Sequence, residues 1–340
     1  MKIRENALLA PLTTLEVGGP AKFLVEATTE DDVVESFEFA RSHGLAVFVL
    51  GGGSNVLISD HGFEGLVIKI AHSSIEAGGD FITAAAGEDW DAFVDHTVGM
   101  HLAGVECLSG IPGTVGGTPV QNVGAYGQEV SETIVSIRCF DRTNGKFVDL
   151  SNEQCGFTYR SSIFNSTMRD RYVVLSVTFL LIKGGKPKIA YKDLIEFFDG
   201  REPTVAETRA AVLSIRRSKS MVIDRADPNR RSAGSFFKNP IVNKEKFDQI
   251  REAFNENVPH FPARATNIKI PAAWLIERSG FQKGYSMGNA GISTNHTLAI
   301  VNRGGATAKD IINLKNAIQN AVSEKFGIEL VPEPIFVGDL

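Results

Sequence analysis

Apolar residues near the start of the chain recur with two different spacings. Between residues 29 and 43 they lie three or four positions apart, the spacing of one helix face. The positions on that face are Val33, Val34, Phe37 and Ala40. Thr28 and Thr29 precede them and are typical of a helix start. Segments 21–26 and 47–50 are short, apolar and β-prone, so the pattern predicts a strand, a helix and a second strand.

Two further helices begin at recognisable caps. Thr204 and Glu207 form the capping-box pattern, which predicts a helix that runs to about Ser218. Thr307 begins another helix, which Gly327 ends. The apolar residues along one face of this last helix are Ile311, Leu314, Ile318, Val322 and Phe326. This face predicts packing against a core rather than a cofactor site.

The middle of the chain favours strands. Residues 81–100 predict a strand, a turn and a helix from Asp89 to about Met100. Strand-like segments follow at residues 135–141, 146–150 and 172–183. The sequence therefore predicts a mixed α+β protein with several domains, whose boundaries lie near residues 70 and 220.

Composition sets limits on the class of protein. A length of 340 residues allows two or three domains, and 43% hydrophobic with 22% charged residues is ordinary for a soluble protein. No apolar stretch is long enough to span a membrane, and the first twenty residues lack a signal-peptide core. Three scattered cysteines favour a reducing compartment, hence a cytoplasmic protein. Seven histidines without a ligand cluster predict no metal site, and a net charge of −5 argues against a general nucleic-acid binder.

Three consecutive glycines, Gly51 to Gly53, follow the strand at residues 47–50. A dinucleotide fingerprint requires a third glycine where Val56 stands, and a P-loop requires a lysine that is absent here. Strand signals rather than a helix come next. The loop is either a tight turn or a nest of backbone amides that holds an anion.

A second glycine-rich stretch covers residues 109–127. It has six glycines, two prolines and no charged residue in 19 positions, which is unusual for a loop exposed to solvent. Two loops of this kind favour a large cofactor that approaches bare backbone.

Charged residues are unevenly placed in the second half. Residues 216–238 contain seven basic and two acidic side chains. This excess indicates either a solvent-exposed basic face or a binding site for a small anion. Arg160 and Glu333 stand among apolar neighbours. Arg160 requires an anionic partner because its charge is partly buried. Glu333 lies in a predicted strand, where it either pairs with an arginine or has a raised pKa that suits proton transfer. No histidine lies near Ser235 in sequence, so a Ser–His hydrolase lacks local support, although distant residues can assemble one.

Five stretches resemble, in this order, those of the UDP-N-acetylenolpyruvoylglucosamine reductase family. They are GGGSNVL, IPGTVGGTPVQNVGAYG, FTYRSSIF, AGSFFKNP and PEP. The resemblance extends from about Leu12 to Phe336. IAYKDL, residues 189–194, resembles the loop of the type I branch that places Tyr191 over the substrate. The segment between Lys219 and Ser235 is longer than in some members of that branch.

The resemblance implies the FAD-binding fold of the vanillyl-alcohol oxidase and p-cresol methylhydroxylase type. Residues 1–69, joined by the tail 329–340, would form the first FAD subdomain, residues 70–219 the second, and residues 220–328 the substrate domain. The implied reaction is the NADPH-dependent reduction of UDP-N-acetylglucosamine enolpyruvate to UDP-N-acetylmuramate for peptidoglycan. Hydride would pass from N5 of reduced FAD to the methylene carbon. The implied protein is a cytoplasmic monomer without nucleic-acid or membrane partners.

The resemblance also implies residue roles. The FAD-binding residues would be Leu50, Gly51, Gly52, Gly53, Ser54, Asn55, Val56, Ser109, Gly110, Ile111, Pro112, Gly113, Gly116, Gly117, Gln121, Asn122, Gly124, Ala125, Tyr126 and Arg160. The substrate-binding residues would be Tyr159, Tyr191, Lys219, Asn239 and His296. Ser235 would protonate the carbon next to the methylene carbon, while Arg160 and Glu333 polarise the enol ether.

Two other functions remain open at this point. One is a flavin oxidase of the same fold, whose common mark is a histidine or cysteine bonded to the flavin. Neither glycine loop contains either residue. The other is a non-catalytic nucleotide-binding module, which would have no use for Arg160, Ser235 and Glu333 together.

Overall fold

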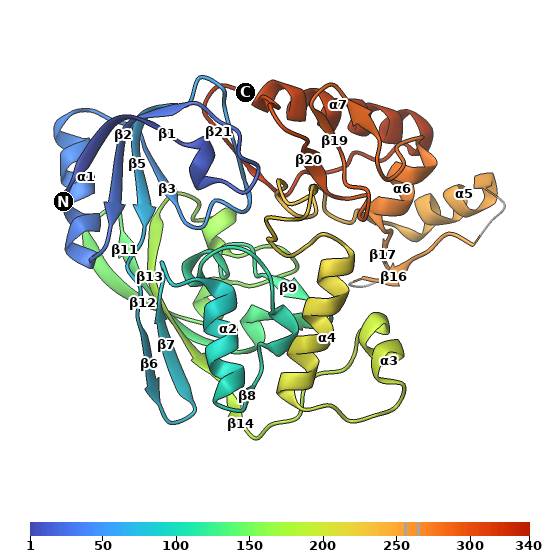
Figure 1. Ribbon diagram of the computed structural model, residues 1–340, viewed down its shortest axis with the longest axis horizontal. Helices are drawn as coiled ribbons and strands as arrows, with labels where there is room; N and C mark the ends of the chain where they lie inside the picture. Colours follow the sequence, from blue (N-terminus) through green and yellow to red (C-terminus); the bar gives the residue numbers. More distant parts are fainter. Residues whose placement is uncertain (255–256, 264–265) are drawn as a thin grey trace. The chain divides into compact units, whose positions relative to one another are not determined.

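A computed structural model describes residues 1–254, 257–263 and 266–340 (Figure 1). The chain divides into two compact units. Unit 1 comprises residues 1–7, 21–53 and 63–223. Unit 2 comprises residues 8–20, 54–62 and 224–340. Two short early segments therefore belong with the C-terminal part of the chain. The three-part assignment into FAD and substrate domains stays a prediction.

The first sheet of unit 1 has the strand order β1-β2-β5-β3. Its strands are β1 (Ile3–Leu8), β2 (Pro20–Ala27), β3 (Val47–Leu50) and β5 (Phe63–Ile70). β5 is parallel to both β2 and β3, and helix α1 (Glu30–Ser42) packs beside it (Figure 1). Thr29 caps α1 in a full capping box with Asp32. The predicted strand, helix and strand are confirmed.

The second sheet of unit 1 is antiparallel, in the order β12-β11-β13-β7-β6. Its strands are β6 (Ile75–Gly78), β7 (Phe81–Ala85), β11 (Ile134–Asp141), β12 (Lys146–Ser151) and β13 (Tyr172–Leu180). Asp89 caps helix α2 (Trp90–Gly99), as expected. Trp90 and Phe93 of α2 pack on Phe179 of β13, so helix and sheet share one core.

One predicted strand ends early. β13 stops at Leu180, whereas the sequence predicted a strand to Lys183. The amide of Leu181 donates to the carbonyl of Asp80, and β14 (Ile182–Lys183) then pairs with β8 (Leu102–Ala103). Apolar residues continue beyond Leu180, but the backbone hydrogen bonds of residues 181–183 are made with Asp80 and β8 rather than with β7 and β11.

Unit 1 also contains two helices and a small hairpin. These are α3 (Lys192–Phe198), α4 (Val205–Ser218), β9 (Gly124–Ala125) and β10 (Gln128–Glu129). Thr204 and Glu207 form the expected capping box of α4. Arg209 of α4 donates to both carboxylate oxygens of Asp91 in α2, at 2.6 and 3.0 Å, which ties α4 to α2.

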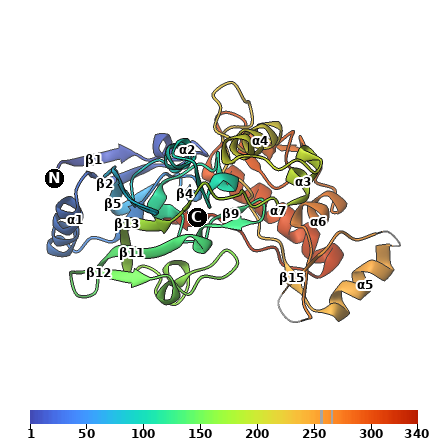
Figure 2. The same ribbon diagram turned by 90° about the horizontal axis from the view of Figure 1, so that it is seen from below.

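The described residues of unit 2 form short strands and three helices around a core of their own. Its elements are β4 (Val56–Ile58), β15 (Ile241–Val242), α5 (Lys244–Phe254), β16 (Phe261–Pro262), β17 (Ile268–Lys269), α6 (Ala272–Arg278), β18 (Ser286–Met287), β19 (Ala290–Ile292), β20 (Ile300–Asn302), α7 (Ala308–Phe326) and β21 (Ile335–Val337). β4 is parallel to β21, which lies near the C-terminus, and Figure 2 labels β4 beside that end of the chain. The predicted apolar face of α7 is buried, and Gly327 ends the helix at φ 60°.

Within the described part of the chain, no helix combines the length and apolarity that membrane crossing requires. Those same residues contain no cluster of metal-ligating side chains. Cys107, Cys139 and Cys155 are free thiols and buried.

Candidate active site

The two glycine loops meet within unit 1. A Cβ built on Gly52 would lie 2.6 Å from the Cα of Gly113, and one on Gly51 would lie 3.0 Å from Thr114 Oγ1. Gly113 is held in place because its carbonyl accepts from the Trp90 amide at 3.1 Å. The loops therefore approach more closely than any side chain at position 52 would allow.

Thr114 carries an unpaired hydroxyl at this contact. Its Oγ1 is buried and has no hydrogen-bond partner among the residues that the structure describes. A buried hydroxyl without a partner is costly, and a ligand oxygen would satisfy it. Bare glycine backbone on one side and an orphaned hydroxyl on the other suit a ligand with phosphate or ring oxygens. The anion-nest interpretation of Gly51–Gly53 thus fits better than a plain turn.

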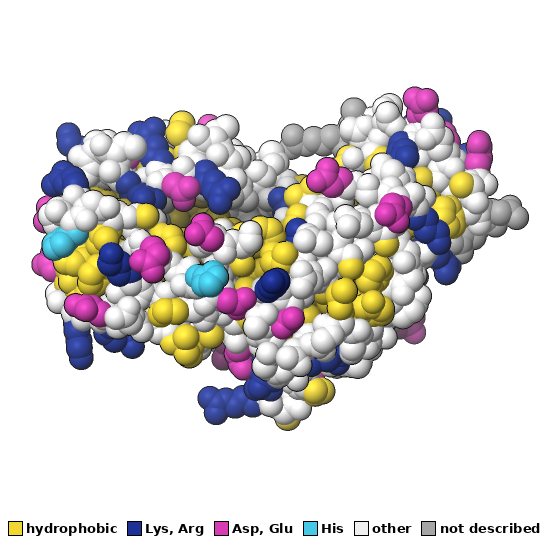
Figure 3. All heavy atoms as spheres, turned by 90° about the horizontal axis from the view of Figure 1, so that it is seen from above, with side chains coloured by type: hydrophobic (Ala, Val, Ile, Leu, Met, Phe, Trp, Pro, Cys, Tyr) yellow, Lys and Arg dark blue, Asp and Glu magenta, His cyan; other side chains and the backbone are white. Residues whose placement is uncertain are grey.

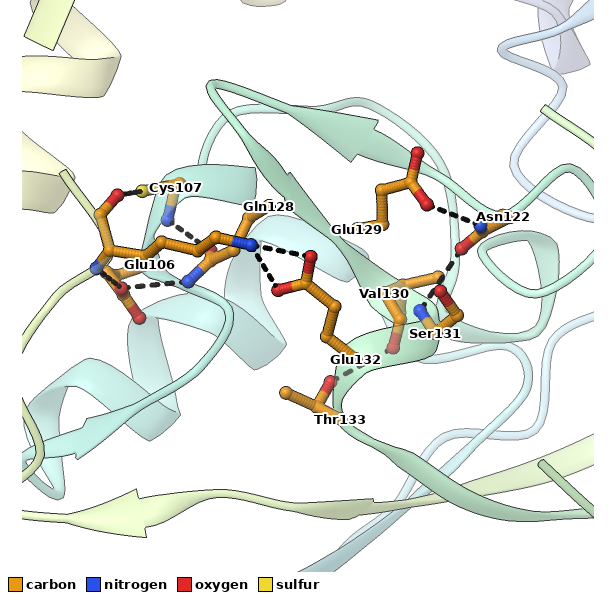
Figure 4. Close-up of polar contacts among 10 residues, drawn as sticks. Glu106, Cys107, Asn122, Gln128, Glu129, Val130, Ser131, Glu132 and Thr133 are labelled. Atoms are coloured by element: carbon orange, nitrogen blue, oxygen red, sulfur yellow. Dashed lines mark hydrogen bonds and ion pairs between the residues drawn. The ribbon is translucent and has the colours of Figure 1, made fainter. Parts of the chain in front are cut away.

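Three non-glycine residues of the predicted site have left-handed backbone conformations. Asn122, Tyr126 and Arg160 have φ values of 46°, 48° and 52°. Such conformations cost energy and persist where surrounding contacts enforce them. Asn122 shows how: its Nδ2 donates to Glu129 at 2.9 Å, and its Oδ1 accepts from the Ser131 amide at 3.1 Å (Figure 4).

Arg160 is joined to the same loop. Its guanidinium donates to the carbonyl of Gly124 at 2.6 Å and to that of Asn122 at 3.4 Å. The guanidinium carbon also lies 5.4 Å from the ring centre of Tyr159. These two carbonyl oxygens accept from the guanidinium and fix its orientation.

A buried carboxylate joins this loop to the segment before Tyr191. Glu106 is fully buried. Its Oε1 accepts from Gln128 Nε2 at 2.9 Å and from the Lys188 amide at 3.3 Å, and its Oε2 accepts from the Gly104 amide at 2.6 Å. Figure 4 shows Gln128 between Glu106 and the amide of Cys107. Glu106 thereby fixes the Gln128 hairpin and the chain that leads to Tyr191.

Tyr191 and Lys219 lie at the ends of neighbouring helices. Tyr191 is the N-cap of α3, and its ring packs edge-on against Tyr126 at 5.5 Å between centres. Lys219 is the C-cap of α4 and forms an ion pair with Asp193. Burial disfavours the ammonium, but the hydrogen bond and charge of Asp193 outweigh it and raise the pKa of Lys219.

The basic stretch 216–238 is neither entirely a solvent-exposed face nor entirely a binding site for a small anion. Arg216 is buried, which lowers its pKa, and its Nε has no partner among the described residues. Arg230 and Arg231 pair with Glu16 in unit 2. Figure 3 shows basic and acidic side chains interspersed over the face that it draws.

Unit 2 gathers the remaining predicted catalytic residues. The Phe236 amide donates to Leu298 O at 2.8 Å, and Phe236 O accepts from the Glu333 amide at 2.9 Å. Ser235 thus precedes a residue whose backbone is hydrogen-bonded to segments on both sides. Its Oγ lies 3.3 Å from Nε2 of His296. The side-chain Nδ2 of Asn55 donates to Glu333 O at 3.2 Å.

Three sequence expectations need correction or extension here. Glu333 lies before strand β21 rather than within it, because its amide pairs with Phe236 instead. Asn239, predicted to bind substrate, uses its Oδ1 to accept from the Ala272 amide at the start of α6. The Ser235–His296 contact joins residues 61 positions apart, so no local pattern indicated it. Glu106, Thr114 and Asp193 were missed, although Thr114 stands inside the quoted glycine-rich stretch.

The predicted site residues divide between the units. Those in unit 1 are Leu50, Gly51, Gly52, Gly53, Ser109, Gly110, Ile111, Pro112, Gly113, Gly116, Gly117, Gln121, Asn122, Gly124, Ala125, Tyr126, Tyr159, Arg160, Tyr191 and Lys219. Those in unit 2 are Ser54, Asn55, Val56, Ser235, Asn239, His296 and Glu333.

Comparison with known proteins gives a consistent result. Residues 21–151 match the model of an FAD binding domain, and residues 227–337 match the C-terminal domain of UDP-N-acetylenolpyruvoylglucosamine reductase. The reductase of that name from Thermobifida fusca is 44% identical over 98% of this chain and 97% of its own. That from Nocardia farcinica is 45% identical over 99% of this chain and 90% of its own. The crystal structure of the Thermus caldophilus reductase superposes with a TM-score of 0.70 at 27% identity, covering 99% of this chain and 100% of the other.

Proposed function

Because the chain belongs to the UDP-N-acetylenolpyruvoylglucosamine reductase family, we propose that it reduces the enolpyruvyl ether of UDP-N-acetylglucosamine enolpyruvate. The product would be UDP-N-acetylmuramate, a precursor of peptidoglycan, and NADPH would be the electron donor. Membership makes the chain an oxidoreductase with an FAD-binding domain of the α+β vanillyl-alcohol oxidase type. We further propose that it acts as a monomer in the cytoplasm.

The loops of unit 1 suit FAD. Gly51 and Gly52 let the two loops approach at distances that a Cβ would not allow, and the buried Thr114 hydroxyl has no partner among the described residues, so a ligand oxygen would satisfy it. The amides of Gly51–Gly53 would hold the pyrophosphate. Bound FAD would supply the redox step, taking hydride from NADPH and giving it to the methylene carbon of the substrate.

Arg160 would stabilise the charge that this step creates. Hydride addition at the methylene carbon leaves negative charge on the adjacent carbon and its carboxylate. Stabilisation of developing charge by a preorganised cation is usually a large catalytic effect. The Gly124 and Asn122 carbonyls orient the Arg160 guanidinium before substrate arrives, so little reorganisation is required. The sugar nucleotide would be bound by Tyr159, Tyr191, Lys219, Asn239 and His296.

Ser235 and Glu333 would complete the reaction. The observation that carries this proposal is that Phe236 holds Ser235 on the segment hydrogen-bonded to Glu333. Ser235 would give its hydroxyl proton to the carbon that bears negative charge, while Glu333 polarises the enol ether. A hydroxyl beside an imidazole could also act as a nucleophile. Family membership favours the role of acid.

Stopped-flow measurements on the purified protein without oxygen test the proposal. NADPH should bleach the flavin absorbance, and the enolpyruvyl sugar nucleotide should restore it. UDP-N-acetylglucosamine, which lacks the enolpyruvyl group, is the control and should not restore it. Ser235→Ala should leave bleaching unchanged and slow restoration by about 100-fold or more, the range for a positioned acid.

Other outcomes would contradict the proposal. Restoration by oxygen but not by the enolpyruvyl compound would indicate an oxidase. A protein that binds UDP-sugars without flavin would indicate a binding module. Equal slowing of both half-reactions by Ser235→Ala would assign Ser235 to the fold or to flavin binding.

A further inference from the structure

Lys69 of β5 contacts the first glycine loop through its side chain. Its Nζ donates to the carbonyl oxygen of Gly51 at 3.4 Å, and the residue is half-buried. In the parallel register, Lys69 lies opposite Leu50, the last residue of β3, so it stands beside the point where the loop begins. The sheet therefore places an ammonium group at the carboxyl end of its strands, the edge at which open parallel sheets bind ligands.

The neighbouring carboxylate on β2 has a different partner. Glu26 lies opposite Lys69 in the register of β2 and β5. It forms an ion pair with Arg4 of β1, and the two side chains are joined by a hydrogen bond. Glu26 thus does not draw the ammonium of Lys69 away from the glycine loop, and the contact with Gly51 is left in place.

This contact sets the direction of the peptide group between Gly51 and Gly52. The peptide is trans, so its carbonyl oxygen and its N–H point in opposite directions. Because Lys69 holds the oxygen of Gly51 on one side, the N–H of Gly52 points to the other. Gly53 has a φ of 66°, the left-handed conformation that lets successive amides converge on an anion. Lys69 therefore fixes the first amide of such a nest.

A loop of three glycines needs restraint from outside. Glycine loses more conformational freedom on ordering than any other residue, and a ligand that must order its own loop binds less tightly. Close packing of Gly52 on Gly113 restrains the loop on one side. The hydrogen bond from Lys69 restrains the carbonyl of Gly51. Together they order the loop before a ligand arrives.

We propose that Lys69 is a positioning residue for FAD: by holding the oxygen of Gly51, it keeps the N–H of Gly52 directed at the pyrophosphate. The glycine amides supply the donors, and Lys69 supplies their orientation. The inference depends on FAD as the cofactor and not on the identity of the substrate. The competing interpretation is a lysine that only stabilises the sheet. It would change flavin binding only as far as it unfolds the protein.

Flavin release from the full-length holoenzyme separates these two interpretations. Lys69→Met keeps the apolar stem but removes the donor, whereas Lys69→Arg keeps a donor and the charge. Lys22→Met, a change at an exposed lysine of β2 in the same sheet, is the control. After dilution into buffer without flavin, the rise of flavin fluorescence gives the rate constant of FAD dissociation. Circular dichroism, recorded over the same time, reports whether the protein remains folded.

We expect Lys69→Met to release FAD about 3- to 10-fold faster than the wild type, the range for one net hydrogen bond. Its circular dichroism should stay that of the folded protein throughout. Lys69→Arg and Lys22→Met should release FAD at the rate of the wild type. The difference should persist at high salt, because salt screens long-range attraction between exposed charges far more than a half-buried hydrogen bond. Should Lys69→Met fail to fold, Lys69→Gln, whose side chain is one bond shorter, carries the comparison.

Three results would overturn the inference. Equal rates of FAD release from Lys69→Met and the wild type would show that the contact with Gly51 does not order the loop. Release that coincides with loss of the circular dichroism signal would assign Lys69 to the stability of the sheet. A difference that vanishes at high salt would indicate long-range attraction instead of positioning. A wild-type protein that binds no flavin would refute the cofactor and the inference with it. A flavin-loaded protein that does not reduce the enolpyruvyl compound would refute the proposed function alone.

Discussion

The ammonium group of Lys219 forms an ion pair with the carboxylate of Asp193. Both residues lie at helix ends in unit 1, and Asp193 stands two positions after Tyr191. The lysine proposed to bind a diphosphate therefore already has an anionic partner. Substrate phosphate must share this cation with Asp193 or displace the carboxylate, which makes Asp193 a determinant of affinity.

Replacing Lys219 by alanine should weaken substrate binding. Loss of one charge-assisted contact costs about 1.5–3 kcal/mol, so KM for the sugar nucleotide should rise by roughly 10- to 150-fold. Asp193→Asn should shift KM in the opposite direction at low salt, since a competing negative charge is removed. Flavin bleaching by NADPH should change little in either variant. Lys192→Ala removes an exposed neighbouring lysine paired with Glu196 and serves as the control. A KM of Lys219→Ala equal to that of Lys192→Ala would exclude the phosphate contact.

Substitution of Gly52 should release the flavin. The Cβ of alanine would meet Gly113 Cα at 2.6 Å, and valine would add a branched side chain there. We expect both variants to elute from gel filtration with less flavin per protein than wild type, valine with the least. Gly99→Ala is the matched control, because a Cβ there meets nothing within 4 Å. A folded Gly52→Val variant with full flavin content would show that the loops do not cradle the cofactor.

The carboxylate of Asp141 should make the free energy of unfolding depend on pH in the acidic range. The Arg171 guanidinium, together with Thr143, lowers the pKa of Asp141 to about 2. A carboxyl group depressed below its unfolded pKa stabilises the fold fully above about pH 4, and this contribution disappears as pH falls toward 2. Asp141→Asn should lower the unfolding free energy at pH 7 by about 1–3 kcal/mol.

The pH dependence supplies the internal control for Asp141. Urea unfolding of wild type and Asp141→Asn should give midpoints that differ at pH 7 and converge between pH 4 and pH 2. A difference that stays constant over this range would mean that the substitution acts through packing rather than through the carboxylate charge.

The two carboxylates that contact Lys188 should contribute very differently to stability and to substrate binding. Glu106 is buried and accepts from the Lys188 amide, whereas Glu132 pairs with Nζ of the same residue at the surface. Glu106→Gln places an amide donor against groups that donate, so we expect a loss of about 1–3 kcal/mol and a higher KM, since Lys188 leads to Tyr191. Glu132→Gln should cost at most about 1 kcal/mol, as exposed ion pairs do. Thermal melts and substrate titrations of both variants would measure this, and equal effects would contradict the assigned role of Glu106.

Local patterns predicted the elements well, for a physical reason. The capping boxes of Thr204 and Thr307 involve residues three positions apart, and the buried face of α7 repeats with the helical period. Each is visible in a short window because the interaction itself is short-ranged. The end of β13 depends on Asp80, about a hundred residues away, and no window contains both partners.

Side-chain partners in the site were harder to foresee than residue identities. The sequence resemblance selected Ser235, Lys219 and Asn239, but their contacts with His296, Asp193 and the Ala272 amide arise from chain segments brought together by folding. Thr114 shows the converse limitation. It lies in a recognised loop, yet the absence of a partner for its hydroxyl becomes visible only when its surroundings are known.

The pairing of β4 with β21 has a consequence for biosynthesis. Unit 1 contains no residue beyond 223, whereas unit 2 requires residues 8–20 and 54–62 from the beginning of the chain. The Asn55–Glu333 hydrogen bond spans 278 residues, which a ribosome adding 5–20 residues per second takes about 14–56 s to synthesise. During that time the apolar strand β4 has emerged but its partner has not been made. Nascent chains of this protein therefore carry an unpaired strand edge, a target for chaperones and for aggregation, until translation reaches β21.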